Sequence, residues 1–226
     1  MKHLVVLSGA GISAESGIKT FRDADGLWEG YDVMEVASPI GWEKKPELVL
    51  KFYNDRRRQL LEVKPNTAHK TLKELEKNFK VSIITQNVDN LHERAGSKNV
   101  LHLHGELLKS RSTKNEKLIY DCDKDIMLGD KAEDGGQLRP HIVWFGEAVP
   151  EMHKAAKIVE TADILLVIGT SLQVYPAASL IDYLPDGKPI YIIDPKRHED
   201  RLLDHVHFIE DTACNGIKEF ADLMSK

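Results

Sequence analysis

The sequence predicts an α/β fold, a doubly wound parallel sheet of Rossmann-like type with a small lobe formed by two insertions. Four short runs are apolar and rich in β-branched residues, which is typical of strands buried on both faces of a parallel sheet. They are residues 4–7 (LVVL), 81–85 (VSIIT), 164–168 (ILLVI) and 190–193 (IYII). Amphipathic stretches alternate with these runs, so we expect helices on both faces and ligands at the carboxyl ends of the strands.

Four helices are expected from apolar spacing and from residues that favour helix ends. Leu72, Leu75 and Phe79 recur at helical intervals and indicate a helix over residues 66–78. Pro46 favours the first turn of a second helix, which is expected to end at Glu62. The other two helices are expected over residues 151–160 and 214–224.

Two segments interrupt this alternation and are interpreted as the small lobe. Residues 31–64 are rich in charged and aromatic side chains, and residues 106–142 are polar with little signal for buried strands. The ranges 1–30, 65–105 and 143–226 are assigned to the Rossmann-like domain.

The composition excludes several classes of protein. Of the 226 residues, 42% are hydrophobic and 30% charged, which excludes a disordered chain, and the length suits one large core. The net charge of −5 argues against nucleic-acid binding, and no apolar run approaches the ~18 residues of a membrane span. The first residues pass from an apolar run directly into a glycine turn, unlike a signal peptide, so a cytoplasmic protein is expected.

A glycine turn follows the first predicted strand. Gly9, Gly11 and Ala14 fit the pattern GxGxxA, in which the backbone approaches a pyrophosphate at a helix amino terminus. A tight structural turn is the alternative interpretation of the same residues. Hydride transfer is disfavoured, because the acidic residue expected about 20 positions later, Glu29, lies in a loop. Arg22 can pair with a phosphate or lie on the surface as a solvated side chain.

Polar side chains follow the later strands. Gln86, Asn87 and Asp89 come directly after a buried strand and are candidates to face a ligand, although Asn87 or Asp89 could instead cap a helix over 90–95. The turn Gly169–Thr170–Ser171 and Asp194 end two further strands at positions that suit nucleotide hydroxyls. The turn could also be a simple helix start.

Two histidines close the strand predicted over residues 100–103. Alternation places His102 and His104 on one face, with Leu101 and Leu103 on the other. A histidine at the carboxyl end of a strand, beside Gly105, suits a general base, because its pKa lies near neutral pH. Metal binding is disfavoured, because no third ligand lies close in the sequence.

Five segments of the chain form recognisable motifs. They are GAGISAESGIKTFRDADGLW (9–28), TQNVDNLHERAG (85–96), HLHGE (102–106), RPHIVWFGE (139–147) and IGTSLQVYPAA (168–178). In this order they resemble the sirtuin family of NAD-dependent protein-lysine deacylases, and the resemblance spans nearly the whole chain. The segment FYNDRRRQLL (52–61) further resembles the bacterial and mitochondrial subgroup that removes acidic acyl groups.

The resemblance implies NAD as cofactor, with His104 and Asn87 as catalytic residues and His104 as the base. It implies that the acyl oxygen of the lysine attacks C1′ of the nicotinamide ribose, and that nicotinamide, 2′-O-acyl-ADP-ribose and free lysine are formed. Many members have Asn where Asp194 stands. The residues implied to bind the cofactor are Gly9, Ala10, Gly11, Ile12, Ser13, Ala14, Gly17, Thr20, Phe21, Arg22, Trp28, Gln86, Asn87, Asp89, Gly169, Thr170, Ser171, Asp194, Pro195, Lys196 and Ala213.

The resemblance also implies how the acylated lysine of a protein substrate is bound. Tyr53 and Arg56 share one face of their predicted helix and can together bind a carboxylate, which favours succinyl- or malonyl-lysine beside acetyl-lysine. The alternative is a solvated basic run over 56–58. Ala37 is small where the subgroup leaves space for a longer acyl chain. A strand and wall along the substrate peptide are implied for Val143, Trp144, Phe145 and Gly146.

The sequence departs from the family at the zinc ribbon. Two CxxC pairs are expected between the histidine motif and the RP motif, but Ser112, Asn115, Lys131 and Asp134 stand near those positions. Cys122 and Cys214 cannot supply four thiolates, so we predict no structural zinc and no metal site. The lobe is then expected to be held by its own apolar side chains, namely Leu118, Ile119, Tyr120, Ile126, Met127 and Leu128.

Two other functions stay open at this point. One is NAD-dependent mono-ADP-ribosylation in the same pocket, and the other is a non-catalytic sensor of NAD or ADP-ribose. The intact His104, Asn87 and Asp89 argue against the sensor. We expect a monomer without nucleic-acid or membrane partners, and the sequence does not reveal which proteins are its targets.

Overall fold

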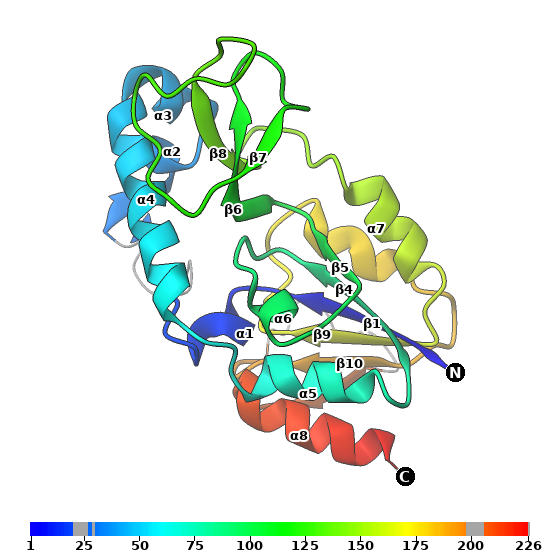
Figure 1. Ribbon diagram of the computed structural model, residues 1–226. Coiled ribbons are helices and arrows are strands. Elements are labelled where there is room, and N and C mark those ends of the chain that lie inside the picture. Colours follow the sequence, from blue (N-terminus) through cyan, green and yellow to red (C-terminus); the bar gives the residue numbers. More distant parts are fainter. Residues whose placement is uncertain (20–26, 29, 198–205, 226) are drawn as a thin grey trace.

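The computed structural model describes residues 1–19, 27–28, 30–197 and 206–225, and its centre is a six-stranded parallel sheet (Figure 1). The strand order is β11-β10-β9-β1-β4-β5, so the chain builds one side of the sheet outward from β1 and then returns to build the other. This arrangement confirms the predicted doubly wound fold. The strands are β1 (His3–Ser8), β4 (Lys80–Thr85), β5 (Val100–His102), β9 (Ile164–Ile168), β10 (Ile190–Ile193) and β11 (Val206–Ile209).

Helices cover both faces of this sheet. Helices α5 (Thr67–Leu75) and α8 (Ala213–Met224) lie together on one face, with Leu4 and Val6 of β1 in the same apolar cluster. Helix α7 (Met152–Val159) and the 3₁₀ segment η1 (Ala177–Tyr183) pack on the other face with Val5 and Leu7. Successive residues of β1 therefore point to opposite cores, because side chains alternate along a strand.

The ends of the helices follow local hydrogen bonds. Asn66 caps α5 by accepting from the main-chain N–H groups of Ala68 and His69 at 2.9 and 3.4 Å, and the His69 ring accepts from the Asn66 N–H in return. This reciprocal cap fixes the start of the helix. The helix ends at Leu75 rather than at the predicted residue 78, and turns follow it.

A second, smaller group of elements lies beside the sheet (Figure 1). Three antiparallel strands, in the order β7-β6-β8, stand next to the long helix α4 (Pro46–Glu62). The sequence showed little signal for buried strands over 106–142, and backbone pairing holds these largely polar strands. The domain boundaries given above stay a prediction. The remaining elements are α1 (Gly11–Ala14), β2 (Leu27–Trp28), β3 (Tyr31–Asp32), α2 (Val33–Val36), α3 (Pro39–Lys44), α6 (Leu91–Arg94), β6 (Gly105–Ser112), β7 (Ile119–Asp121) and β8 (Leu138–Ile142).

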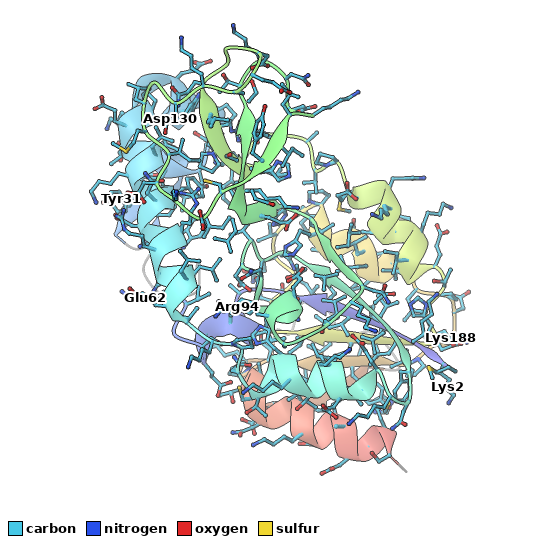
Figure 2. The ribbon with its side chains drawn as sticks, in the orientation of Figure 1. Lys2, Tyr31, Glu62, Arg94, Asp130 and Lys188 are labelled. Carbon is cyan, nitrogen blue, oxygen red and sulfur yellow. The ribbon has the colours of Figure 1, made fainter. Side chains whose placement is uncertain are left out.

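Arg94 joins the two groups of elements. It lies at the end of α6, and Figure 2 labels it near Glu62 at the end of α4. Its guanidinium donates to the carbonyls of Leu60 at 2.9 Å and Val63 at 2.5 Å. The carboxyl end of α4 is thereby fixed against the segment that follows β4.

The lobe does contain an apolar cluster, but side chains other than the predicted six form most of it, among them Val36, Val49 and Phe52. Of the six side chains, Ile126 is buried, whereas Ile119, Met127 and Leu128 are exposed by 44, 60 and 54%. The side chain of Asn54 instead donates to the carbonyl of Ile126 and accepts from its N–H, both at 2.9 Å. Polar contacts to the backbone therefore hold this segment where apolar packing was expected.

Two positions near the expected zinc ligands contact each other directly. The Ser112 hydroxyl lies 2.8 Å from the carboxylate of Asp134, and it accepts from the N–H groups of Lys114 and Asn115. Asp134 also accepts from the N–H of Gly136 at 2.9 Å. Within the described ranges, no three His, Cys, Asp or Glu side chains gather in a metal-binding group. Nor does any helix there have the length and apolar character of a membrane span.

Candidate active site

Two glycine turns meet where the strand order reverses, between β1 and β9. Gly9 donates to the carbonyl of Ile168 at 3.1 Å, and Gly11 donates to that of Gly169 at 2.9 Å. A Cβ on Gly9 would lie 2.6 Å from Cβ of Thr170, and one on Gly11 would lie 2.7 Å from Cα of Gly169. Gly169 itself has a φ of +64°. Only glycine allows the two turns to lie this close, at the edge where ligands bind in such sheets.

The rest of the predicted cofactor loop lies next to this contact. Ala10 precedes the short helix α1, and Ile12 is buried in the core beneath it. Ala14 ends α1 and is exposed, and Gly17 leaves it with a φ of +96°. Trp28 packs edge-on against Phe52 of α4 at 5.1 Å between ring centroids. The predicted residues Thr20, Phe21 and Arg22 lie outside the described residues.

Ser13 connects the glycine turn to the segment after β4. Its hydroxyl donates to Asp89 Oδ2 at 2.9 Å and accepts from Asn87 Nδ2 at 3.2 Å. Asp89 Oδ1 also accepts from the N–H of Leu91 at 3.1 Å, so this carboxylate both caps α6 and binds Ser13. All three polar side chains are buried, and burial raises the pKa of Asp89. From the sequence, Asp89 was expected either to face a ligand or to cap the following helix, and these two roles are compatible.

His104 is oriented by a single hydrogen bond. Its Nδ1 lies 3.0 Å from the carbonyl of Gln86, and a carbonyl can only accept, so Nδ1 carries the hydrogen. Nε2 then keeps a lone pair and has no hydrogen-bond partner among the described residues. Burial lowers the pKa of His104, which favours the neutral ring that a general base needs.

His102 has a different environment. Its two ring nitrogens lie 2.9 Å from the carbonyl of Asn87 and 2.8 Å from Oε1 of Glu93. Both nitrogens are therefore occupied. Leu101 and Leu103 on the opposite side are buried in the core under α7.

The predicted adenosine residues lie at the ends of β9 and β10. The Thr170 hydroxyl accepts from Gln86 Nε2 at 3.1 Å, which joins the turn after β9 to the segment after β4. Asp194 ends β10, and its Oδ1 accepts from the N–H of Lys196 at 2.9 Å. The remaining residues predicted for adenosine are Ser171 beside Thr170, the exposed Pro195, and the buried Ala213 at the start of α8.

Tyr53 and Arg56 line one pocket together with Asp89. The Arg56 guanidinium stands 4.9 Å from the centroid of the Phe52 ring. The Tyr53 hydroxyl accepts from Nε1 of Trp144 at 3.0 Å, and burial raises the pKa of this phenol. The pocket is lined by Ile18, Lys19, Trp28, Tyr53, Arg56, Gln59, Leu60, Val88, Asp89 and Leu107. Tyr53 therefore stays a neutral hydroxyl beside a cation.

In the segment expected to form a strand along the peptide, Val143 and Trp144 have no regular secondary structure, and a turn covers Phe145 and Gly146. Strand β8 ends at Ile142, and the N–H of Glu147 donates to the carbonyl of Trp144 at 3.0 Å. Gly146 has a φ of +91°, which suits a turn and not a strand. The segment still lies beside the site, because the N–H of Val143 donates to the carbonyl of His104 at 2.9 Å. Next in the chain after Trp144, Phe145 is 41% exposed.

Sequence reasoning missed two buried histidines beneath Ser13. Nε2 of His92 lies 3.0 Å from the Ser8 hydroxyl, and Nε2 of His69 lies 3.5 Å from the Ser13 hydroxyl. Their rings are 4.9 Å apart, and burial lowers the pKa of His69 to about 4. Both imidazoles are therefore neutral near pH 7. His92 lies within the quoted motif TQNVDNLHERAG, which was the one signal that could have pointed to it.

Comparison with known proteins decides the family. The family model described as the Sir2 family matches residues 9–176, from the glycine turn through the turn after β9. The chain belongs to the Sir2 family. This Sir2-family chain is 62% identical over 226 residues to a protein of Helicobacter pylori named NAD-dependent protein deacylase, with 100% of the chain and 97% of the relative covered.

Solved structures agree with this assignment. A Sir2 homologue in complex with NAD has a TM-score of 0.89 and 40% identity, with 99% of this chain and 90% of that one covered. A mutant Sir2 homologue in complex with 2′-O-acetyl ADP ribose has a TM-score of 0.88 and 39% identity, with 100 and 94% covered. At sequence identities of 39 and 40%, these structures resemble the chain in sequence as well as in fold.

Proposed function

We propose that this chain is an NAD-dependent protein-lysine deacylase, which forms nicotinamide, 2′-O-acyl-ADP-ribose and free lysine. The observation that carries the proposal is the position of His104. Its imidazole is fixed through Nδ1 to the carbonyl of Gln86, in the same segment whose Asn87 and Asp89 bind Ser13 of the glycine turn. The names and ligands of the similar proteins support the same activity.

The residues present fit NAD. Gly9 and Gly11 let the turn after β1 pack closely against Gly169 and Thr170, at the sheet edge where a diphosphate binds in folds of this type. Asp194, at the end of β10, offers carboxylate oxygens that can accept from ribose hydroxyls. When bound, NAD would supply the ribose carbon that receives the acyl oxygen and the nicotinamide leaving group.

The protein side of the reaction is a proton transfer at a fixed nitrogen. Nε2 of His104 can accept a hydroxyl proton, while the Gln86 carbonyl holds Nδ1–H and stabilises the imidazolium that forms. Asn87 and Asp89 are fixed by Ser13, so their polar groups keep one orientation. Apolar side chains of the adjoining pocket, among them Leu60, limit the access of water.

For acyl preference, we propose that Tyr53 and Arg56 select succinyl- and malonyl-lysine. The phenol and the guanidinium line the same pocket, and both can donate to a carboxylate at its end. Because burial raises its pKa, the phenol keeps its proton and does not repel an acyl carboxylate.

One reaction tests the proposed activity against the alternatives. The purified chain is incubated with NAD and a succinyl-lysine or acetyl-lysine peptide, and all products are identified by mass spectrometry. The expected result is 2′-O-acyl-ADP-ribose together with unmodified lysine. Protein that carries ADP-ribose would indicate a transferase instead, and NAD binding without any product would indicate a sensor.

A further inference from the structure

His102 lies between two hydrogen-bond acceptors at the end of β5. Nδ1 is 2.9 Å from the main-chain carbonyl of Asn87, and Nε2 is 2.8 Å from Oε1 of Glu93 on α6. The side chain of His102 is only 8% exposed. The ring itself is therefore shielded from water, whereas the side chain of Glu93 is 39% exposed.

The chemistry of the two partners fixes the protonation state of the ring. A neutral imidazole has one N–H, and its second nitrogen can only accept. A carbonyl and a carboxylate are both acceptors, so each ring nitrogen of His102 must carry a hydrogen. The ring is then an imidazolium that forms an ion pair with Glu93. His104, two residues later, faces one acceptor and needs one N–H only.

The imidazolium holds the main chain of a residue proposed for catalysis. The N–H of Asn87 donates to the Thr85 hydroxyl at 3.0 Å, and its carbonyl accepts from His102. With both main-chain groups fixed, the side-chain amide is directed to the Ser13 hydroxyl at 3.2 Å. A neutral ring has one N–H, and the carboxylate of Glu93 is the stronger of the two acceptors, so loss of the His102 proton would release the Asn87 carbonyl.

The charged groups around His102 favour the imidazolium. Glu93 faces it from α6, Glu106 from β6 and Asp89 from the segment after β4, while the neighbouring His92 is neutral. Burial lowers the pKa of His102, but the hydrogen bond and charge of Glu93 outweigh burial and raise it overall. A raised pKa keeps the charge at neutral pH and loses it as the pH rises.

We propose that His102 is a positioning residue that acts as an imidazolium, and that loss of its proton sets the alkaline limit of catalysis. His104 must be neutral and His102 charged, so activity is confined between two histidine titrations. The proposal rests on the proposed function only for its kinetic readout.

The variant that tests it is Glu93→Gln. The amide oxygen can still accept from Nε2–H, but the charge that favours the imidazolium is gone. We expect the alkaline limb of kcat/KM to move to lower pH by about one unit, so that activity at pH 9 falls about tenfold further than at pH 6.5. His102→Asn retains an amide that can donate to the Asn87 carbonyl and does not titrate, so its alkaline limb should be absent.

A matched control separates this effect from a loss of surface charge. Glu74→Gln removes the same charge from an exposed ion pair with Lys77, and its pH profile should equal that of the wild type. An equal loss at all pH values in Glu93→Gln would indicate a merely structural role and overturn the proposal. An unchanged profile would overturn it as well.

A spectroscopic measurement keeps the proposal testable without any activity. In ¹⁵N-labelled protein at pH 7, both ring nitrogens of His102 should show the shifts of a protonated imidazolium, and in Glu93→Gln the ring should become neutral at lower pH. A neutral His102 at pH 7 in the wild type would exclude the proposal. This result does not depend on deacylation, so failure of the proposed function remains distinguishable.

Discussion

The parallel sheet and the lobe beside it are held together in different ways. Two apolar clusters, one on each face, surround the sheet, and every residue of β9 is buried among apolar neighbours. In the lobe, the fully buried Arg57 donates to the carbonyl of Leu107 and to Asn54. The lobe also has an apolar cluster of its own, which includes Val49 and Phe52. It differs from the sheet in that buried arginines add polar contacts whose loss leaves a buried charge unpaired.

The largest expected effect is on the stability of the lobe. Glu147 accepts from the Arg139 guanidinium at 2.7 Å, from Arg111 at 3.3 Å and from the N–H of Trp144 at 2.8 Å. Glu147→Ala leaves two poorly exposed guanidinium groups without this partner, so the free energy of unfolding should fall by about 3 kcal/mol. Denaturant unfolding measures the change.

A matched variant sharpens this comparison within the same lobe. Glu35→Ala removes the exposed ion pair with Lys45, and such pairs contribute less than about 1 kcal/mol. Equal losses from Glu35→Ala and Glu147→Ala would contradict the view that a few buried contacts stabilise the lobe.

The next effect is on chemistry at the edge of the sheet. His104→Ala should lower kcat by about 100-fold or more on acetyl and succinyl peptides alike, because the general base is removed from every reaction. Steady-state kinetics on both peptides measure it, with the exposed His153→Ala on α7 as control. Near-normal turnover of the His104 variant would remove this residue from the role of base.

A smaller and selective effect is expected on the lobe side of the pocket. Arg56→Met should weaken desuccinylation about tenfold while deacetylation changes little, because only the succinyl group carries a carboxylate for the guanidinium. The ratio of kcat/KM for the two peptides is the readout. Arg58→Met, which removes an arginine paired with Asp55 and Asp125, serves as control. Equal losses on both peptides would show that Arg56 does not bind the acyl carboxylate.

The smallest expected effect is that of metal removal. Ser112 and Asp134 contact each other where the family carries zinc thiolates, so dialysis against a chelator should leave the melting temperature unchanged. Metal analysis of the purified protein should find no stoichiometric zinc. Zinc bound to the lobe would overturn the prediction.

The two regions also differ in what the sequence could predict. The four apolar runs correspond to β1, β4, β9 and β10, because burial on both faces leaves a simple pattern in the residues. The lobe leaves no such pattern. Part of its order comes from single polar side chains such as Asn54, which binds both main-chain groups of Ile126 far along the sequence.

The site shows the same division. Motif spacing indicated Ser13, Asn87 and Asp89, and the structure brings these three into contact. The sequence predicted His104 as the base, but the different surroundings of His102 were beyond it, because they depend on whether a second acceptor faces each ring. The turn at Gly146 was also not predicted. The sequence alone does not show whether a glycine adopts a positive φ in a turn or lies in an extended loop beside a strand.

The interlocking of Gly9 and Gly11 with Gly169 has a consequence for biosynthesis. On the ribosome the first glycine turn emerges early, but its partner emerges only when β9 has been translated. A nascent chain that stops before β9 carries the whole phosphate-binding motif and half of the sheet, yet lacks the backbone against which the motif is shaped. The turn after β1 can therefore complete its hydrogen bonds only after β9 has been translated and has paired with β1.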